Sequence, residues 1–196
     1  MKNIWFFGDS YTRNWGCQFG DDYFQQYYTP TSKTWTELVE QHFDGRQKNT
    51  AQNGAGNDAI LAKLRDNFFD VQPEDIVIIY KSSYYHRVAA FNQGLTTYDI
   101  TKNSNSTKCE KATAAYYFDC LDEYEYYIDH IAKQYNFFVD LFKKQDNRVI
   151  LWDTEFYTSH YTSIEKIANV HSLKGHWTYK GHSQFFELFK KHYLEN

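Results

Sequence analysis

The sequence is poor in cysteine and has neither a long apolar run nor a block of basic residues. Its 196 residues include three cysteines, Cys17, Cys109 and Cys120, an odd number without the spacing of metal ligands. This pattern indicates neither a disulfide framework nor a zinc site and favours reduced thiols, as in the cytosol. No stretch approaches the roughly 20 apolar residues of a membrane-spanning helix, so we expect no membrane partner.

The opening of the chain is not typical of a secretory signal peptide. Its first apolar run covers only residues 4–7, and Gly8 and Asp9 end it. We therefore expect a cytoplasmic protein, or one released by lysis as part of a larger particle such as a virion. The formal net charge is -4, and the longest cationic clusters, at 143–144 and 190–191, are typical of solvated helix ends. Nucleic acid is not expected as a partner.

Aromatic residues, by contrast, make up 20% of the chain, with 18 tyrosines and 16 phenylalanines. A small core needs fewer aromatic side chains than this. Some of these rings are expected on the surface, at a binding groove or a subunit contact, where tyrosine offers an apolar ring with a polar tip. A coding bias toward Tyr, Phe, Asn and Lys would explain the same excess, and the oligomeric state stays open.

Short apolar runs alternate with segments of helical spacing along the whole chain. We expect strands at 2–7, 48–52, 76–80 and 148–152, with a further short one at 167–170, and helices at 35–43, 58–69, 112–144 and 178–193. This alternation predicts an α/β sandwich with a mostly parallel sheet, in a single domain spanning 1–196. Residues 91–111 are polar and aperiodic, which predicts a long loop or lid insertion.

Residues suited to nucleophilic catalysis lie at the expected carboxyl edge of this sheet, where ligand sites of such folds gather. Ser10 follows the first strand in a turn opened by Gly8, where its backbone N–H can face an oxyanion. A serine hydroxyl needs a base, and His176, just before the last helix, is the candidate. A simple turn or a helix cap is the alternative for Ser10. Three other histidines are rivals for the base: His160, His171 and His182.

Two loops add candidate oxyanion donors and substrate ligands. Gly54 would donate its backbone N–H, since glycine lets a substrate approach the main chain closely. Asn57 would add its side-chain amide; alternatively, Asn57 or Asp58 caps the following helix. The residues that we expect to bind an acidic sugar or a phosphate group, or else to be charges of a surface loop, follow the strand at 76–80: Lys81, Tyr84, His86 and Arg87.

These segments resemble blocks I, II and V of the SGNH (GDSL) hydrolase family. The matching residues are Gly8-Asp9-Ser10 within 4–12, Gly54, and Gly175-His176-Trp177 leading into 178–182. The resemblance follows the element order from end to end and implies a flavodoxin-like three-layer α/β/α sandwich with about five strands. It implies ester hydrolysis through an acyl-enzyme, without a metal or organic cofactor. Ser10 would be the nucleophile, His176 the general base, and the N–H groups of Ser10 and Gly54 the oxyanion hole.

Two positions depart from the family pattern. Block III, Gly-x-Asn-Asp, normally supplies an asparagine donor, but no asparagine follows the strand at 76–80; Ser83 lies nearest, and its hydroxyl can donate. The block V aspartate, three residues before the histidine, is replaced by Leu173. We expect either a backbone carbonyl or another acid, Asp153 or else Glu155, to orient His176, because a triad depends on geometry and not on sequence order.

Two functions follow from this pattern. The first is a serine esterase that hydrolyses an acyl ester of a small molecule or glycan, most plausibly O-acetyl groups on a carbohydrate. The second is a catalytically weak or inactive SGNH-fold protein used for glycan binding or as a structural component, for example of a virus particle. A flavodoxin-like cofactor binder is disfavoured, because Gly54-x-Gly56 alone is a poor phosphate-binding fingerprint.

Overall fold

The structure is a computed structural model that describes residues 1–13, 32–82, 87–91, 95–99, 124–153, 156 and 179–195. Of residues 87–91, 95–99 and 124–126, the backbone alone is described.

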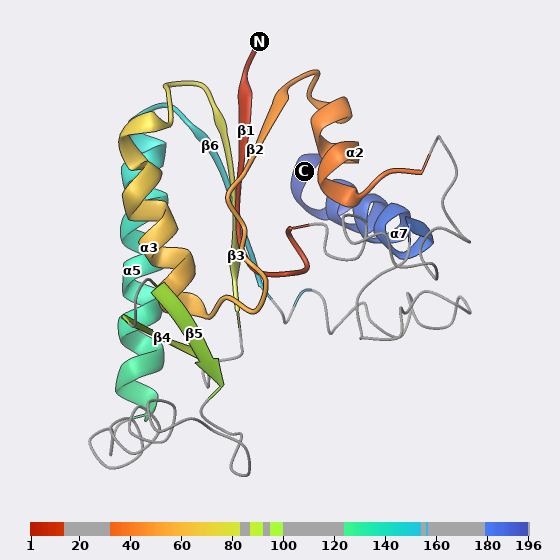
Figure 1. The fold of residues 1–196 in the computed structure, drawn as a ribbon. Helices are drawn as coiled ribbons and strands as arrows, with labels where there is room; N and C mark the ends of the chain where they lie inside the picture. Colours follow the sequence, from red (N-terminus) through yellow and green to blue (C-terminus); the bar gives the residue numbers. More distant parts are fainter. Residues whose placement is uncertain are drawn as a thin grey trace.

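A parallel sheet forms the centre of the molecule (Figure 1). Its described strands are β1 Asn3–Phe7, β2 Arg46–Asn49, β3 Ile76–Lys81 and β6 Arg148–Asp153, in the order β2-β1-β3-β6. Each neighbouring pair is parallel, with Phe6 opposite Ile78 and Ile78 opposite Ile150. All four carboxyl ends therefore lie at one edge, the lower one in Figure 1.

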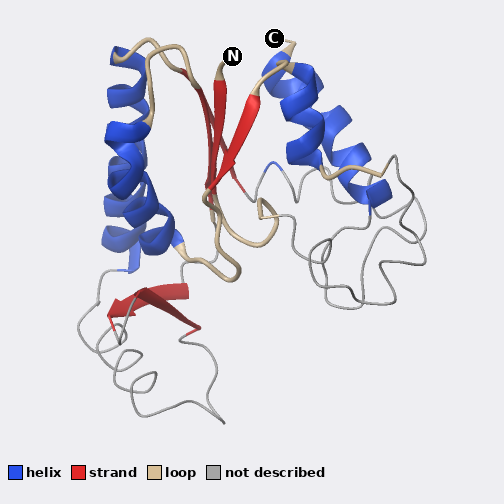
Figure 2. Cartoon of the chain, turned by 45° about the horizontal axis from the view of Figure 1, so that its top comes forward, coloured by secondary structure: helices blue, strands red, loops and turns tan. Residues whose placement is uncertain are grey.

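Helices cover both faces of this sheet, as Figure 2 shows. One face carries α3 Asn57–Asn67 and α5 Tyr124–Lys144, and the other carries α2 Trp35–His42 and α7 Tyr179–Phe189. A 3₁₀ turn, Phe68–Asp70, follows α3, and a π-helical turn, Lys190–Leu194, follows α7. The predicted three-layer α/β/α sandwich with a parallel sheet is confirmed. The fifth strand expected at 167–170 lies outside the described residues.

Aromatic side chains fill the core on the α2 and α7 side. The indole ring of Trp35 is 0% exposed, and four aromatic rings pack around it at centroid distances of 5.1–5.6 Å: Phe6, Trp152, Phe185 and Phe189. Offset and edge-to-face contacts of this kind stabilise a core beyond the area that they bury. Much of the aromatic content therefore serves the core, while Phe69 and Phe137 are exposed.

Two segments differ from the sequence-based expectation. The second strand is 46–49, not 48–52. The N–H and the hydroxyl of Thr50, directly after this strand, both donate to the Phe6 carbonyl oxygen, each at 3.0 Å, so contact with β1 continues one residue beyond it. Within the expected loop at 91–111, β5 Leu95–Asp99 pairs antiparallel with β4 Arg87–Phe91. The threonines and tyrosine of β5 favour an extended backbone. Residues 92–94 and 100–111 lie outside the described residues, so the role as a lid stays a prediction.

The last two α-helices, α5 and α7, lie inside the segments predicted for them, 112–144 and 178–193. The helix expected at 112–144 is described from 124, and residues 112–123 lie outside the described part. Among the helices that the structure describes, none is long and apolar enough to cross a membrane.

Candidate active site

The turn after β1 places Ser10 at the carboxyl edge of the sheet. The Asp9 carbonyl oxygen accepts the N–H groups of Thr12 and Arg13, each at 3.0 Å. Asp9 Oδ1 accepts the N–H of Tyr11 at 3.0 Å, an Asx turn that fixes the same segment from its side chain. Ser10 lies inside this double set of bonds and is 8% exposed. The backbone around the candidate nucleophile is thus held in one conformation.

Gly8 is required by the close packing of this turn. A Cβ at Gly8 would lie 2.3 Å from Thr12 Oγ1, 2.8 Å from Thr12 Cβ and 3.1 Å from Tyr80 Cβ. The first two distances are far below van der Waals contact, and Thr12 is 0% exposed. The glycine of the Gly8-Asp9-Ser10 motif therefore lets the turn pack directly on β3.

Two side chains from neighbouring elements hold the turn from outside. Trp35 Nε1, from the first turn of α2, donates to the Tyr11 carbonyl oxygen at 2.8 Å. Asn49 Nδ2, at the end of β2, donates to the Thr12 carbonyl oxygen at 2.8 Å. Neither Trp35 nor Asn49 was expected at the site. Their partners lie 24 and 37 residues away in the chain, so no local pattern could have identified them.

The glycine loop after β2 lies beside the Ser10 turn. The Gln52 N–H donates to the Gly8 carbonyl oxygen at 3.0 Å, and the Ala55 N–H closes a tight turn onto the Gln52 carbonyl at 3.1 Å. Gly54 lies within that turn at φ +69°, a conformation that side chains other than glycine's disfavour. A Cβ at Gly54 would meet nothing within 4 Å, so open space lies in front of it. The structure thus brings the Ser10 and Gly54 loops together, as predicted.

Asn57 does not face that open space. Its Nδ2 donates to the Ser82 carbonyl oxygen at 2.8 Å, and its Oδ1 accepts the N–H of Ser82 at 2.9 Å and the hydroxyl of Tyr135 at 2.9 Å. Asn57 is 0% exposed, so the expected role as a direct oxyanion donor receives no support. The alternative of a helix cap is also wrong, because Gly56 is the N-cap of α3 and no side chain caps the helix.

Asp153 and Lys81 end two paired strands at the same edge. They are register partners of β6 and β3, and Lys81 Nζ lies 3.7 Å from Asp153 Oδ2. Asp153 Oδ1 also accepts the N–H of Phe156 at 3.0 Å. Burial, and then the charge of Asp153, raises the pKa of Tyr193 to about 12. The carboxylate that we expect to orient His176 therefore already has a cation and a backbone N–H as partners.

Of the remaining candidates, His182 is described in full, Arg87 only by its backbone, and the others not at all. The last histidine of the expected rivals, His182, is buried in α7 at 3% exposure, within the last helix as predicted. Arg87 begins β4, but its side chain is not described. The candidates whose placement is not described are His176, Ser83, Tyr84, His86, Glu155, His160 and His171.

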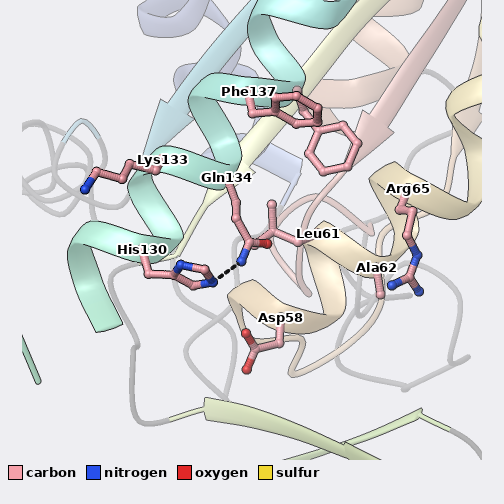
Figure 3. A pocket seen from close by; sticks show the side chains of 9 residues that line it. Asp58, Leu61, Ala62, Arg65, His130, Lys133, Gln134 and Phe137 are labelled. Atoms are coloured by element: carbon pink, nitrogen blue, oxygen red, sulfur yellow. Dashed lines mark hydrogen bonds between the residues drawn. The ribbon is translucent and has the colours of Figure 1, made fainter. Parts of the chain in front are cut away.

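A separate pocket of about 470 Å³ lies between α3 and α5 (Figure 3). Its wall combines apolar residues with charged ones at the rim, and Asp58 at its end accepts the Tyr127 hydroxyl at 3.1 Å. The lining residues are Asp58, Leu61, Ala62, Arg65, His130, Lys133, Gln134, Phe137 and Phe138. Neither Ser10 nor Gly54 lines it, so it is distinct from the candidate active site. No cluster of His, Cys, Asp and Glu in the described part of the chain could hold a metal ion.

The sequence matches no protein-family model and no curated protein. Solved structures are similar in fold. A lipase from a goat rumen metagenome has a TM-score of 0.52 at 12% identity, with 98% of both chains covered. A member of the lipolytic G-D-S-L family from Veillonella parvula has a TM-score of 0.47 at 14% identity, with 100% of both chains covered. A carbohydrate esterase has a TM-score of 0.43 at 14% identity, covering 100% of this chain and 69% of its own. The likeness to the rumen-metagenome lipase, at a TM-score of 0.52, confirms the predicted fold and shows the fold alone.

Proposed function

We propose that the protein is a serine esterase whose nucleophile is Ser10. The observation that supports it best is the pairing of two loops at the carboxyl edge of the sheet. One holds Ser10 in a rigid turn, and the other presents Gly54 at positive φ before open space. The Gln52 N–H ties the second loop to the Gly8 carbonyl of the first. A nucleophile next to a close-approach glycine is the arrangement that acyl transfer needs.

The reaction follows from these roles. The Ser10 hydroxyl attacks the ester carbonyl carbon while His176 takes the hydroxyl proton. The backbone N–H groups of Ser10 and Gly54 donate hydrogen bonds to the negatively charged carbonyl oxygen, and Ser83 supplies the third donor in place of the block III asparagine. Collapse releases the alcohol, protonated by His176, and leaves an acyl-enzyme. Water, deprotonated by His176, then attacks the acyl carbon. Collapse breaks the bond to Ser10 Oγ, which takes the proton back from His176, and the acid is released.

Asp153 is the acid that we propose to orient His176. Its side chain is 32% exposed at the carboxyl edge, within the same layer of loops as Ser10. The ion pair with Lys81 at 3.7 Å is longer than a close hydrogen-bonded pair, so it holds the carboxylate without using all of its acceptor positions. Its partners fix its orientation before the histidine binds to it.

The substrate that we propose is an O-acetyl group on a carbohydrate. The open space next to Gly54 leaves room for the acyl group. The alcohol would lie along the loops after β3 and β6. There Tyr84 offers an aromatic ring, and Lys81, His86 and Arg87 offer donors for sugar hydroxyls or an acidic group. No cofactor takes part.

A second function is favoured by the substitutions at the site. The family asparagine of block III is absent, and Leu173 replaces the block V aspartate. The loss of one oxyanion donor lowers the rate by about 10²–10³-fold. A catalytically weak or inactive protein that binds glycan, or that is built into a larger particle, would retain the same fold.

The deciding experiment compares wild type, Ser10→Ala and His176→Ala in p-nitrophenyl acetate hydrolysis and in labelling by a fluorophosphonate probe. An esterase requires turnover that both substitutions abolish, with labelling of wild type and none of Ser10→Ala. A wild-type protein that neither turns over the ester nor takes the label would favour the inactive protein, and glycan binding would then be measured directly.

A further inference from the structure

A buried hydrogen-bond network joins the first turn of α3 to the end of β3. The carboxamide of Asn57 bonds both backbone groups of Ser82, at 2.8 Å through Nδ2 and at 2.9 Å through Oδ1. The Tyr135 hydroxyl, from α5, donates to the same Oδ1 at 2.9 Å and lies 3.5 Å from the Tyr80 carbonyl oxygen. Asn57, Ser82 and Tyr135 are each 0% exposed, so the network is shielded from bulk solvent.

The chemistry of this contact requires an asparagine. Its planar amide has a donor and an acceptor side by side, and it pairs with Ser82 as the backbone of a neighbouring strand would. Aspartate lacks the donor for the Ser82 carbonyl, and alanine lacks both groups. The loss of either bond removes a buried hydrogen bond between Asn57 and the backbone of Ser82. Asn57 therefore fixes the direction in which the chain leaves β3.

The direction in which the chain leaves β3 matters because each end of the network is close in sequence to a proposed oxyanion donor. Asn57 lies three residues after Gly54, and Ser82 directly precedes Ser83. Gly54 and Ser83 are the two donors that the proposed oxyanion hole takes from outside the Ser10 turn. The carboxamide of Asn57 is thus a bridge between the two loops that must hold their donors at a fixed separation.

We propose that Asn57 and Tyr135 are positioning residues for the oxyanion hole, acting through Ser82. The inference rests on the proposed esterase function, since it assigns the pair a role in that site. Neither side chain touches the substrate. Tyr135 holds the acceptor oxygen of Asn57 in place, and Asn57 holds the exit of β3. Misplacement of a reacting or donor group by about 1 Å can lower a rate by about 100-fold.

The chain offers a matched control for each residue. Asn147 is a second buried asparagine, but its Nδ2 bonds the carbonyl oxygens of Gln72 at 2.7 Å and Asp75 at 3.1 Å, at the amino edge of the sheet. Tyr127 is a second tyrosine of α5 whose hydroxyl bonds the first turn of α3, but at Asp58 and not at Asn57. Both controls remove partly or fully buried side-chain hydrogen bonds without touching the end of β3.

The experiment measures kcat and KM for p-nitrophenyl acetate in wild type, Asn57→Ala, Asn147→Ala, Tyr135→Phe and Tyr127→Phe, at a temperature where thermal unfolding shows each to be folded. We expect Asn57→Ala to lower kcat by about 10- to 100-fold while KM changes less than about threefold. Tyr135→Phe should lower kcat by a smaller factor. Asn147→Ala and Tyr127→Phe should keep the wild-type kcat, although Asn147→Ala unfolds at a lower temperature. Asn57→Gln, which keeps both amide groups, should recover part of the lost kcat.

Each outcome decides a different point. If wild type turns over the ester and labels at Ser10, but Asn57→Ala keeps the kcat of Asn147→Ala, the positioning role is wrong and the esterase function stands. If wild type neither turns over the ester nor labels, the proposed function fails and the positioning role fails with it. If Asn57→Ala does not fold, Tyr135→Phe against Tyr127→Phe decides, because each keeps its aromatic ring in place.

Discussion

Replacement of Asp75 by asparagine should destabilise the protein at neutral pH and have little effect in acid. Asp75 precedes β3 at the amino edge of the sheet and is 4% exposed. Its Oδ1 accepts the backbone N–H of Asn3 at 2.9 Å, and its Oδ2 accepts Trp5 Nε1 and the Gln72 N–H, each at 3.0 Å. One carboxylate therefore joins the start of β1 to the turn before β3.

The magnitude follows from the acceptors that the substitution removes. Burial raises the pKa of Asp75, but the hydrogen bonds from Gln72, Asn3 and Trp5 outweigh burial and leave the pKa below its ordinary value of 3.8. An asparagine presents an NH₂ group where one carboxylate oxygen now accepts, so at least one donor loses its partner. Because bonds to a charged acceptor contribute about 1.5–3 kcal/mol each, we expect a loss of about 2–4 kcal/mol in the free energy of unfolding.

The pH dependence of this loss in unfolding free energy tests whether it comes from the ionised carboxylate of Asp75. The folded-state pKa lies below that of the unfolded chain, so the carboxylate contributes its stability above 3.8 and loses it as the pH falls through the folded value. Urea unfolding, followed by tryptophan fluorescence from about pH 7 to about pH 3, should show a difference between wild type and Asp75→Asn that shrinks below about pH 4. Asp70→Asn, at an exposed carboxylate nearby, is the control. A difference that persists unchanged in acid, or none at neutral pH, would refute the reasoning.

Three further changes test the site and its surroundings. Gly8→Ala should lower stability by about 1–3 kcal/mol and reduce kcat, because its Cβ would lie 2.8 Å from Thr12 Cβ; an unchanged kcat would show that the Ser10 turn absorbs the methyl group. Gly54→Ala should lower stability by only about 1–2 kcal/mol, the cost of positive φ, while kcat/KM falls further as the methyl enters the open space; equal kcat/KM would remove Gly54 from the substrate site. The pKa of Tyr193 is raised from 10.0 to about 12, so wild type should lose stability relative to Tyr193→Phe as the pH rises from 10 toward 12. A difference in unfolding free energy between the two proteins that stays constant across that range, measured by urea unfolding, would contradict this.

The sequence predicts most of the fold because its strands and helices carry strong local patterns. The strand at 76–80 is a continuous apolar run, and it is β3, a central strand buried on both faces. The weak case is β2, an edge strand of sequence Arg-Gln-Lys-Asn, which is half exposed and has no apolar residue. Its pairing with β1 comes from backbone hydrogen bonds, which the side-chain pattern does not report. The predicted strand, 48–52, is therefore shifted toward the C-terminus relative to β2.

The candidate site likewise contains residues that the sequence can predict and residues that it cannot. The glycines at 8 and 54 are required by backbone geometry, a clash at the first and positive φ at the second, so a sequence motif can signal them. The role of Asn57 could not be foreseen. An asparagine next to a helix start fits a cap, an exposed donor or a buried bridge equally well, and only the position of Ser82, 25 residues away, decides among them.

The sequence by itself determined the order of strands and helices, the parallel sheet and the place of Ser10 at a strand end, because these depend on local periodicity and on turn residues close in the chain. Only the tertiary structure decided that Trp35 holds the Ser10 turn and that Lys81 pairs with Asp153. The reason is physical: a buried polar group must be paired, but which distant group pairs with it is set by how the packed layers bring the strand ends together.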